Sequence, residues 1–248
     1  MPANDNKQID ASQPVGGQSI LLSIIIPVYN EADSLVTFLK PLQSLRAQGC
    51  EIIVVDGGSS DDTMALAAPW VDQLQCCEPG RARQMNCGAA LAGGDWLLFL
   101  HADTQLPDSL ALFLQSLSSQ SFGWGFFPVA LSGRSPLFRV IERAISLRSR
   151  LTAVATGDQA MFVARPLFNR VNGFAPIALM EDIALSKRLR QHSRPQVWHE
   201  PVTTSSRRWE RDGILHTVLL MWCLRLGYFL GLSPEYLVRL YYGRRDDS

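Results

Sequence analysis

Short aliphatic runs that end abruptly in polar, turn-forming residues recur along the first hundred residues. The run at residues 22–28 is followed by Y-N-E, and the run at residues 51–55 is followed by D-G-G-S-S-D. Continuous runs of this kind are typical of parallel strands that are buried on both faces. Ligands bind outside the carboxyl ends of such strands. We therefore expect one site to be lined by Tyr29, Glu31, Asp56 and Ser59.

Helical patterns alternate with these runs and predict an α/β protein with a doubly wound, mostly parallel sheet. The predicted strands of the first part are residues 22–28, 51–55, 73–77 and 96–100, with helices at 32–47, 62–68 and 83–91. After residue 103 the regular alternation of strand and helix patterns ends. The pattern there predicts helices at 107–117, from 136, from 166 and at 182–191, and strands at 122–131, 159–164 and 196–198.

The C-terminal part contains a strongly apolar segment, residues 214–232, which is interrupted by His216 and Arg225. A mid-helix arginine costs about 2.5–3.5 kcal/mol on membrane-insertion scales, which argues against a spanning helix. Two interpretations remain, a helix packed on the main domain and a helix lying at a membrane interface. We expect a disordered tail at residues 1–20, a main domain at 21–212 and a helical segment at 213–248.

Composition narrows the functional class. The chain has 248 residues, of which 47% are hydrophobic, and this suits one globular domain. Its formal net charge is zero, which argues against a nucleic-acid partner. From residue 187 onward, eleven Lys or Arg face six Asp or Glu, so this part suits phosphates or an anionic membrane surface. Five cysteines without metal-binding or disulfide spacing indicate a reduced, cytoplasmic protein.

Two strings resemble the nucleotide-sugar-binding half of the family 2 glycosyltransferases, S-I-I-I-P-V-Y-N-E-A and E-I-I-V-V-D-G-G-S-S-D. The resemblance implies the A-type glycosyltransferase fold and a UDP-type nucleotide sugar as donor. It places the donor on Pro27, Tyr29, Glu31, Asp56, Gly58, Ser59, Arg81, Arg83 and Ala102, with Arg83 preferred to Arg81. Arginines at a helix start would offset phosphate charge. The alternatives are that Asp56 only begins a turn and that the arginines form a solvated helix face.

The string L-L-F-L-H-A-D-T resembles the metal-binding strand end of A-type glycosyltransferases. That family usually has Asp-x-Asp, whereas here His101 replaces the first aspartate and Asp103 keeps the second. A divalent cation, Mn2+ or Mg2+, would bridge Asp103 to the donor diphosphate. His101 is either a further ligand or a structural histidine.

The string L-M-E-D-I resembles the Glu-Asp motif of the family and implies that Asp182 is the general base, with Glu181 orienting the acceptor. Capping of a helix start is the alternative. The expected acceptor-side residues are Gly157, Asp158, Gln159, Arg207, Arg208 and Trp209. The alternative for residues 157–159 is a plain turn. The alternative for Arg207 and Arg208 is a basic pair on the surface. Ser205 stands where processive members have Gln, which argues against a polysaccharide synthase.

Together with G-R-A-R-Q-M-N and T-G-D-Q-A, these strings are similar to a bacterial subgroup, the selenodomain-associated transferases. The leading hypothesis is an inverting, metal-dependent glycosyltransferase with a hydroxyl acceptor, cytoplasmic or peripheral on the inner face of the cell membrane. Two alternatives remain, a nucleotidyltransferase and a non-catalytic protein that binds a nucleotide sugar. The sequence names neither sugar nor acceptor, and it does not set the oligomeric state.

Overall fold

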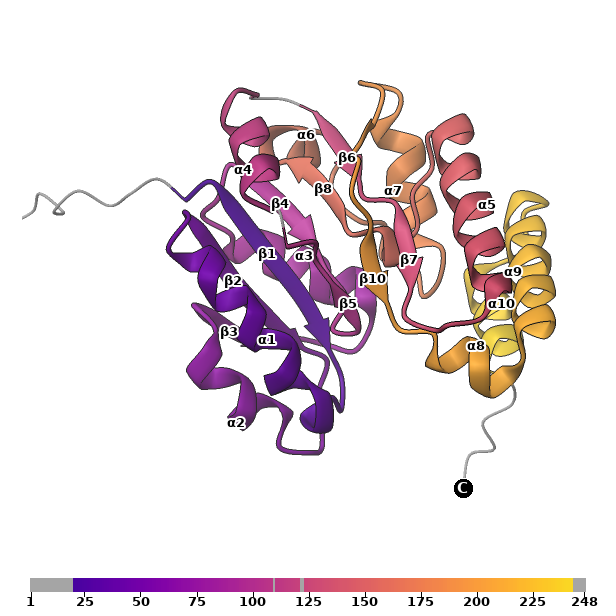
Figure 1. The fold of residues 1–248 in the computed structure, drawn as a ribbon, viewed down its shortest axis with the longest axis horizontal. Coiled ribbons are helices and arrows are strands. Elements are labelled where there is room, and N and C mark those ends of the chain that lie inside the picture. The colour runs from indigo at the N-terminus through magenta and orange to yellow at the C-terminus, as the bar shows by residue number, and fades with distance from the viewer. Residues whose placement is uncertain (1–19, 109, 121–122, 243–248) are drawn as a thin grey trace, which may run out of the picture.

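Two aliphatic strands form the centre of the larger sheet (Figure 1). β1 (Leu22–Val28) pairs in parallel with β2 (Cys50–Asp56), and almost every residue of both is buried. This burial is what unbroken apolar runs predict. The structure is a computed structural model that describes residues 20–108, 110–120 and 123–242. The tail expected at residues 1–20 therefore lies outside the described residues, except for Ile20.

The larger sheet has seven strands in the order β3-β2-β1-β4-β8-β6-β9. Strand β8 runs antiparallel to both of its neighbours, and the other pairings of this sheet are parallel. The prediction of a mostly parallel α/β sheet is confirmed. The remaining strands of this sheet are β3 (Gln73–Cys76), β4 (Trp96–Phe99), β6 (Trp124–Phe126), β8 (Met161–Ala164) and β9 (Gln196–Val197).

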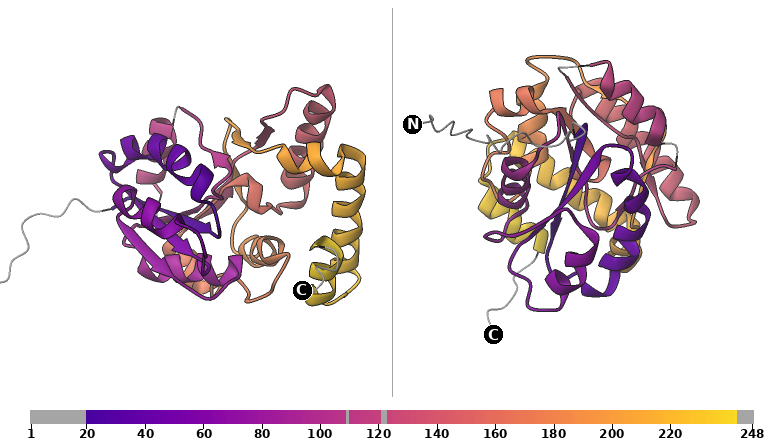
Figure 2. Two further views of the ribbon diagram at one scale, coloured as in Figure 1. Left: turned by 90° about the horizontal axis from the view of Figure 1, so that it is seen from below. Right: turned by 90° about the vertical axis from the view of Figure 1, so that its left-hand side faces the viewer.

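Helices cover both faces of this sheet. α1 (Ala32–Arg46) and α2 (Thr63–Ala67) lie on one face, and α3 (Arg81–Leu91) lies on the other (Figures 1 and 2). Helix α3 approaches the strands closely, because a Cβ on its Gly88 would stand 2.5 Å from the Cγ2 atom of Ile25. That contact leaves room for glycine alone, and it holds the start of α3 near the carboxyl ends of β1 and β2.

The strand predicted at residues 122–131 is wrong as one element, and its first residue lies outside the described part. The chain forms β6 and then β7 (Val129–Leu131), which belongs to a second sheet ordered β5-β10-β7. Pro128 lies between the two strands, and proline donates no ladder hydrogen bond. The partners β5 (Thr104–Gln105) and β10 (Val202–Thr204) were not predicted, since strands this short show no readable period.

The remaining helices follow the predicted order, except that α8 was not expected. Their bounds are α4 (Leu110–Ser118), α5 (Pro136–Thr152), α6 (Arg165–Arg170), α7 (Glu181–Leu189), α8 (Arg207–Asp212), α9 (Ile214–Phe229) and α10 (Pro234–Tyr242). Within the described ranges, no helix combines the length and the apolar character needed to cross a bilayer.

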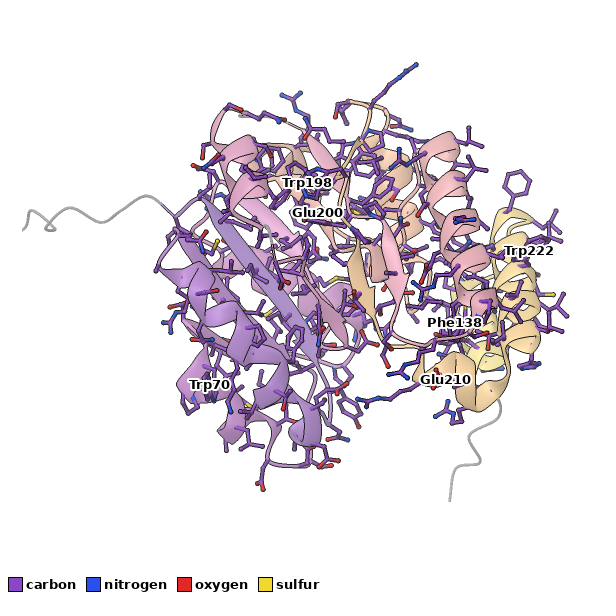
Figure 3. All side chains as sticks on the ribbon, viewed as in Figure 1. Trp70, Phe138, Trp198, Glu200, Glu210 and Trp222 are labelled. Atoms are coloured by element: carbon purple, nitrogen blue, oxygen red, sulfur yellow. The ribbon has the colours of Figure 1, made fainter. Side chains whose placement is uncertain are left out.

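Helix α9 lies at one edge of the molecule (Figure 2). Two of its faces carry apolar side chains. Its inner face packs into a small core with Met180, Ile183, Leu224 and Leu237. Its outer face carries large side chains that are each at least 59% exposed, and Trp222 lies at that outer edge (Figure 3). We call this set the outer face: Leu215, Leu219, Trp222, Leu226, Phe229 and Leu230.

Candidate functional site

The loops that follow β1 and β2 are joined by hydrogen bonds, so the structure brings these strand ends together as expected. The backbone N–H of Asn30 donates to Ser59 Oγ at 2.8 Å, and the N–H of Ser60 donates back to Asn30 Oδ1 at 2.9 Å. The N–H of Glu31 donates to Thr63 Oγ1 at 2.8 Å. The polar residues after the two strands therefore form one connected surface.

Asp56 organises this surface from within. Its carboxylate accepts the backbone N–H groups of Gly58 and Ser59, each at 2.8 Å, and the side chain is 1% exposed. Gly58 has φ +87°, a conformation that suits glycine. Asp56 thus begins a turn, and contact with a nucleotide remains a prediction for it. Tyr29 is 56% exposed at the same strand ends, where a planar ring would be accessible to a base.

Gln84 of α3 is a contributor that the sequence did not reveal. Its buried amide nitrogen Nε2 donates to the carbonyl oxygens of Val28 at 2.8 Å and Val55 at 2.9 Å. Val28 is the last residue of β1 and Val55 the last but one of β2, so one side chain ties the two strands together near their carboxyl ends. The available signal is a polar residue between Ala82 and Met85 on the buried side of α3.

One cavity, of about 360 Å³, lies between α1 and the second sheet, and we call it the donor-side cavity. Glu31, Asp103 and Arg207 line it, together with Ala102. The Asp103 carboxylate accepts a hydrogen bond from Thr104 Oγ1 at 3.2 Å. Asp33 of α1 also lines it, so three carboxylates and a guanidinium share one cavity.

A second cavity, of about 110 Å³, lies on the other side of the segment 101–103, and we call it the acid-pair cavity. Its lining comes from the start of α3, the end of β4, the start of α7 and the inner faces of α9 and α10. The polar residues that line it are Arg81, His101, Thr156, Asp158, Glu181, Asp182, Arg225 and Tyr241. The C-terminal helices thus form one wall of this cavity.

Glu181 and Asp182, which we call the acid pair, occupy the first turn of α7. The residue before them, Met180, has φ +68°. Asp182 Oδ2 accepts the backbone N–H of Gly157 at 2.7 Å, and its Oδ1 accepts the N–H of Ile183 at 2.7 Å. Glu181 is only 7% exposed. Burial, and then the charge of Asp182, raises the pKa of Glu181 to about 7. A carboxyl poised near neutral pH beside a second carboxylate is suited to proton transfer.

His101 faces the acid-pair cavity rather than the cavity that Asp103 lines. Its Nδ1 atom lies 3.7 Å from Asp158 Oδ1, and its ring packs on Gly157, where a Cβ would stand 2.5 Å from the ring. The expected metal pair of His101 and Asp103 is therefore not assembled in one cavity. A structural histidine that positions the loop at residues 156–159 fits this arrangement better.

Without His101, the candidate metal ligands in the donor-side cavity are carboxylate oxygen atoms. The described residues hold no group of three or more His, Cys, Asp or Glu that would form a complete cation site. Asp103 and Glu31 line the donor-side cavity together. One or two carboxylates completed by phosphate oxygens and waters suit Mg2+ or Mn2+, so these residues fit a cation that arrives with a diphosphate.

Several expected site residues have structural roles instead. Gln159 is fully buried, and its Oε1 accepts Ser149 Oγ at 2.8 Å, so it holds the loop and offers no contact to an acceptor. Arg83 forms an exposed ion pair with Glu78 at 3.0 Å, whereas Arg81 lines the acid-pair cavity. Neither arginine lines the donor-side cavity, so donor binding by Arg81 or Arg83 stays a prediction.

The three residues of the Arg-Arg-Trp string also lie in different environments. Arg207 lines the donor-side cavity. Arg208 lies 3.8 Å above the Tyr241 ring and so ties α8 to α10, while half-buried Trp209 lines neither cavity. Arg207 thus lines the donor-side cavity and not the acid-pair cavity, and the acceptor-side role expected for these three residues stays a prediction.

The family comparison agrees with the strings quoted above. Residues 23–121 match the model described as glycosyl transferase family 2. An uncharacterized glycosyltransferase of Mycobacterium tuberculosis is 33% identical over 171 residues, covering 62% of each chain. A PGL/p-HBAD biosynthesis glycosyltransferase of Mycobacterium bovis is 37% identical over 100 residues, covering 37% of this chain and 39% of that protein. The alignments thus span less than two thirds of these relatives.

Solved structures show the fold. S. aureus TarS superposes with a TM-score of 0.61 at 17% identity, covering 75% of this chain and 60% of that one. The mannosyltransferase PcManGT from Pyrobaculum calidifontis, solved with GDP-Man and Mn2+, gives a TM-score of 0.56 at 21% identity, covering 74% and 56%. Residues 23–121 therefore form a region that matches glycosyl transferase family 2, and the chain shares its fold with these solved structures.

Proposed function

We propose that the protein is an inverting glycosyltransferase that moves a sugar from a UDP-type donor to a hydroxyl acceptor. One observation carries this proposal. His101 and Asp103 stand two residues apart and line two different cavities, one with the acid pair and one with Glu31 and Arg207. A donor diphosphate on the Asp103 side would present its sugar across this segment to an acceptor beside Asp182.

The nucleotide would lie on the joined ends of β1 and β2. Tyr29 offers an exposed ring there, and the turn at Asp56 to Ser59 offers polar contacts. The support for uridine comes from two sources, the strings quoted above and structures of S. aureus TarS with UDP and with UDP-GlcNAc. At these levels of identity the neighbours support the fold, so the choice of UDP belongs to the proposal.

The proposed reaction is a single displacement. Asp182 accepts the proton of the acceptor hydroxyl while that oxygen attacks the anomeric carbon. The bond from this carbon to the diphosphate oxygen breaks, and UDP leaves with the electron pair. The N–H groups of Gly157 and Ile183 hold the Asp182 carboxylate in place. A divalent cation held by Asp103 and Glu31 would neutralise charge on the leaving diphosphate.

A second candidate is a protein that binds a nucleotide sugar without turnover. His101, in place of the usual aspartate, favours it, because only one carboxylate of the family's metal motif remains. The buried Glu181 beside Asp182 argues for catalysis, since a binding protein would need no carboxyl with a raised pKa in a second cavity. Turnover of a bound donor separates the two candidates.

We expect UDP to stabilise the folded protein against heat more than GDP does, and more strongly when Mn2+ is present. A ligand that binds only the folded state at 100 times its dissociation constant adds about 2.7 kcal/mol to the free energy of unfolding. The measurement is thermal unfolding of the full chain with each nucleotide. A shift with GDP and none with UDP would refute the donor assignment.

We further propose a weak, peripheral contact with the cytoplasmic side of a membrane through the outer face. Exposed arginines are present on the two helices drawn beside α9 in Figure 1, Arg143 and Arg150 on α5 and Arg239 on α10. Apolar area combined with cationic side chains suits an anionic bilayer surface. Arg225 does not belong to this surface, because it lies on the inner face of α9 and lines the acid-pair cavity. Arg244 and Arg245 lie outside the described residues.

Flotation with liposomes that contain anionic lipid tests this contact. We expect the protein to float at low salt and to be released at high salt, because the electrostatic part is screened. Replacing Leu219 and Leu226 by serine should abolish flotation. Replacing Leu112, which is 55% exposed on α4, should leave it unchanged. A wild-type protein that stays at the bottom at low salt contradicts the membrane contact.

A further inference from the structure

Three arginines from three separate helices converge on the acid-pair cavity. Arg81, the first residue of α3, and Arg225, on the inner face of α9, both line it. Arg148 of α5 lies close enough for its charge to act on Arg225, Asp182 and Asp158. The proposed reaction needs a base at this place, and it gives no reason for three guanidinium groups.

Arg225 is the least explained of the three. It interrupts an apolar helix, and it is half-buried beside Met221 and Leu224. Within residues 20–108, 110–120 and 123–242, its guanidinium forms neither a hydrogen bond nor an ion pair. The charges of Asp182 and Asp158 act favourably on this guanidinium, but N–H donors that are withdrawn from water without a hydrogen-bond acceptor destabilise the fold.

Arg148 adds a positive charge close to the acid-pair cavity. Burial, and then the charge of Arg225, lowers the pKa of Arg148 to about 10, so it stays protonated at neutral pH. Its Nη2 atom donates to Ser149 Oγ at 2.7 Å, whereas its buried Nε atom has no hydrogen-bond partner among the residues that the structure describes. Two neighbouring guanidinium groups with incomplete hydrogen bonding are suited to an anion, which accepts several N–H donors at once.

We propose that Arg225, supported by Arg148 and Arg81, binds a phosphate or carboxylate group of the acceptor and so brings its hydroxyl to Asp182. This inference rests on the proposed function and names the acceptor class, a small alcohol that carries an anionic group. A neutral alcohol would leave Arg225 without a partner. The anion belongs to the acceptor rather than to the donor, because the donor-side cavity has its own arginine, Arg207.

Thermal unfolding of the full chain with saturating UDP tests this inference, because UDP fills the donor's phosphate position. Inorganic phosphate and glycerol 3-phosphate should each raise the unfolding temperature further, and glycerol should not. Arg225→Gln should weaken binding of both anions by about 10- to 100-fold, the range expected for losing charge-assisted hydrogen bonds. Arg225→Lys should retain part of the affinity.

Arg194→Gln is the matched control, because Arg194 is an exposed arginine after α7 that does not line the cavity. It should leave the affinity for both anions unchanged. The shift with UDP in Arg225→Gln shows that the variant is folded. If phosphate binds equally well to both variants, the site does not include Arg225, and the inference is wrong.

The remaining outcomes separate the two proposals. A wild-type protein that shifts with UDP but with neither anion keeps the proposed function and overturns the anion site. An anion shift that vanishes once UDP saturates the protein assigns the anion to the donor, and this also overturns the inference. An anion shift that depends on Arg225, in a protein that never responds to UDP, supports the anion site while the proposed function fails.

Discussion

Replacing Asp182 by asparagine is expected to reduce sugar transfer by about 10²- to 10⁴-fold, the usual contribution of a general base. The change keeps the shape of a side chain that contacts Gly157 and Ile183, and it removes the ability to accept a proton. Affinity for UDP should change by only a few-fold, because Asp182 lines the acid-pair cavity and not the donor-side cavity.

Asp95→Asn is the control for this experiment. Asp95 is exposed just before β4, at the opposite end of that strand from His101. Its replacement should leave the rate of transfer unchanged. A folded Asp182→Asn protein that transfers sugar at the wild-type rate would remove Asp182 from the mechanism.

Replacing Glu181 by glutamine should change how stability depends on pH. The pKa of this carboxyl is about 7 in the folded protein and 4.5 in its unperturbed state. Between these values the folded state holds a proton that the unfolded state has released, so wild-type stability falls as pH rises. Glutamine cannot ionise, and Glu181→Gln should therefore gain stability relative to wild type across this window, by about 3 kcal/mol in total.

Denaturant unfolding of both proteins between pH 4.5 and 8 measures this difference. The other titrating groups are common to the two proteins, so their contributions cancel in the comparison. Above pH 7 the difference should become constant. Parallel stability curves across the whole range would mean that Glu181 is not buried as a protonated carboxyl.

The sequence predicted those parts of the fold that long apolar runs specify. β1 and β2 lie at their predicted positions because almost every residue of each is apolar and buried. β5 and β10 have two and three residues, which is too few for a period to appear. Their pairing depends on contacts between residues a hundred positions apart, such as Thr104 and Thr204.

The sequence also located the acid pair and the strand ends, because in each case the residues concerned are neighbours along the chain. The division of His101 and Asp103 between two cavities was not readable, because it depends on the direction of each side chain after β4. The position of Arg225 in the acid-pair cavity was not readable for a similar reason. Its helix is apolar on both faces, so the pattern does not reveal which side faces the cavity.

The most direct test of the account is release of UDP from a panel of nucleotide sugars by the full chain, with Mg2+ or Mn2+ present. The panel should include UDP-sugars and GDP-sugars, with water or an anionic alcohol as acceptor. The account predicts that at least one UDP-sugar is consumed, and that Asp182→Asn loses nearly all of this activity. Consumption of no donor, or equal consumption by the wild-type and Asp182→Asn proteins, would contradict it.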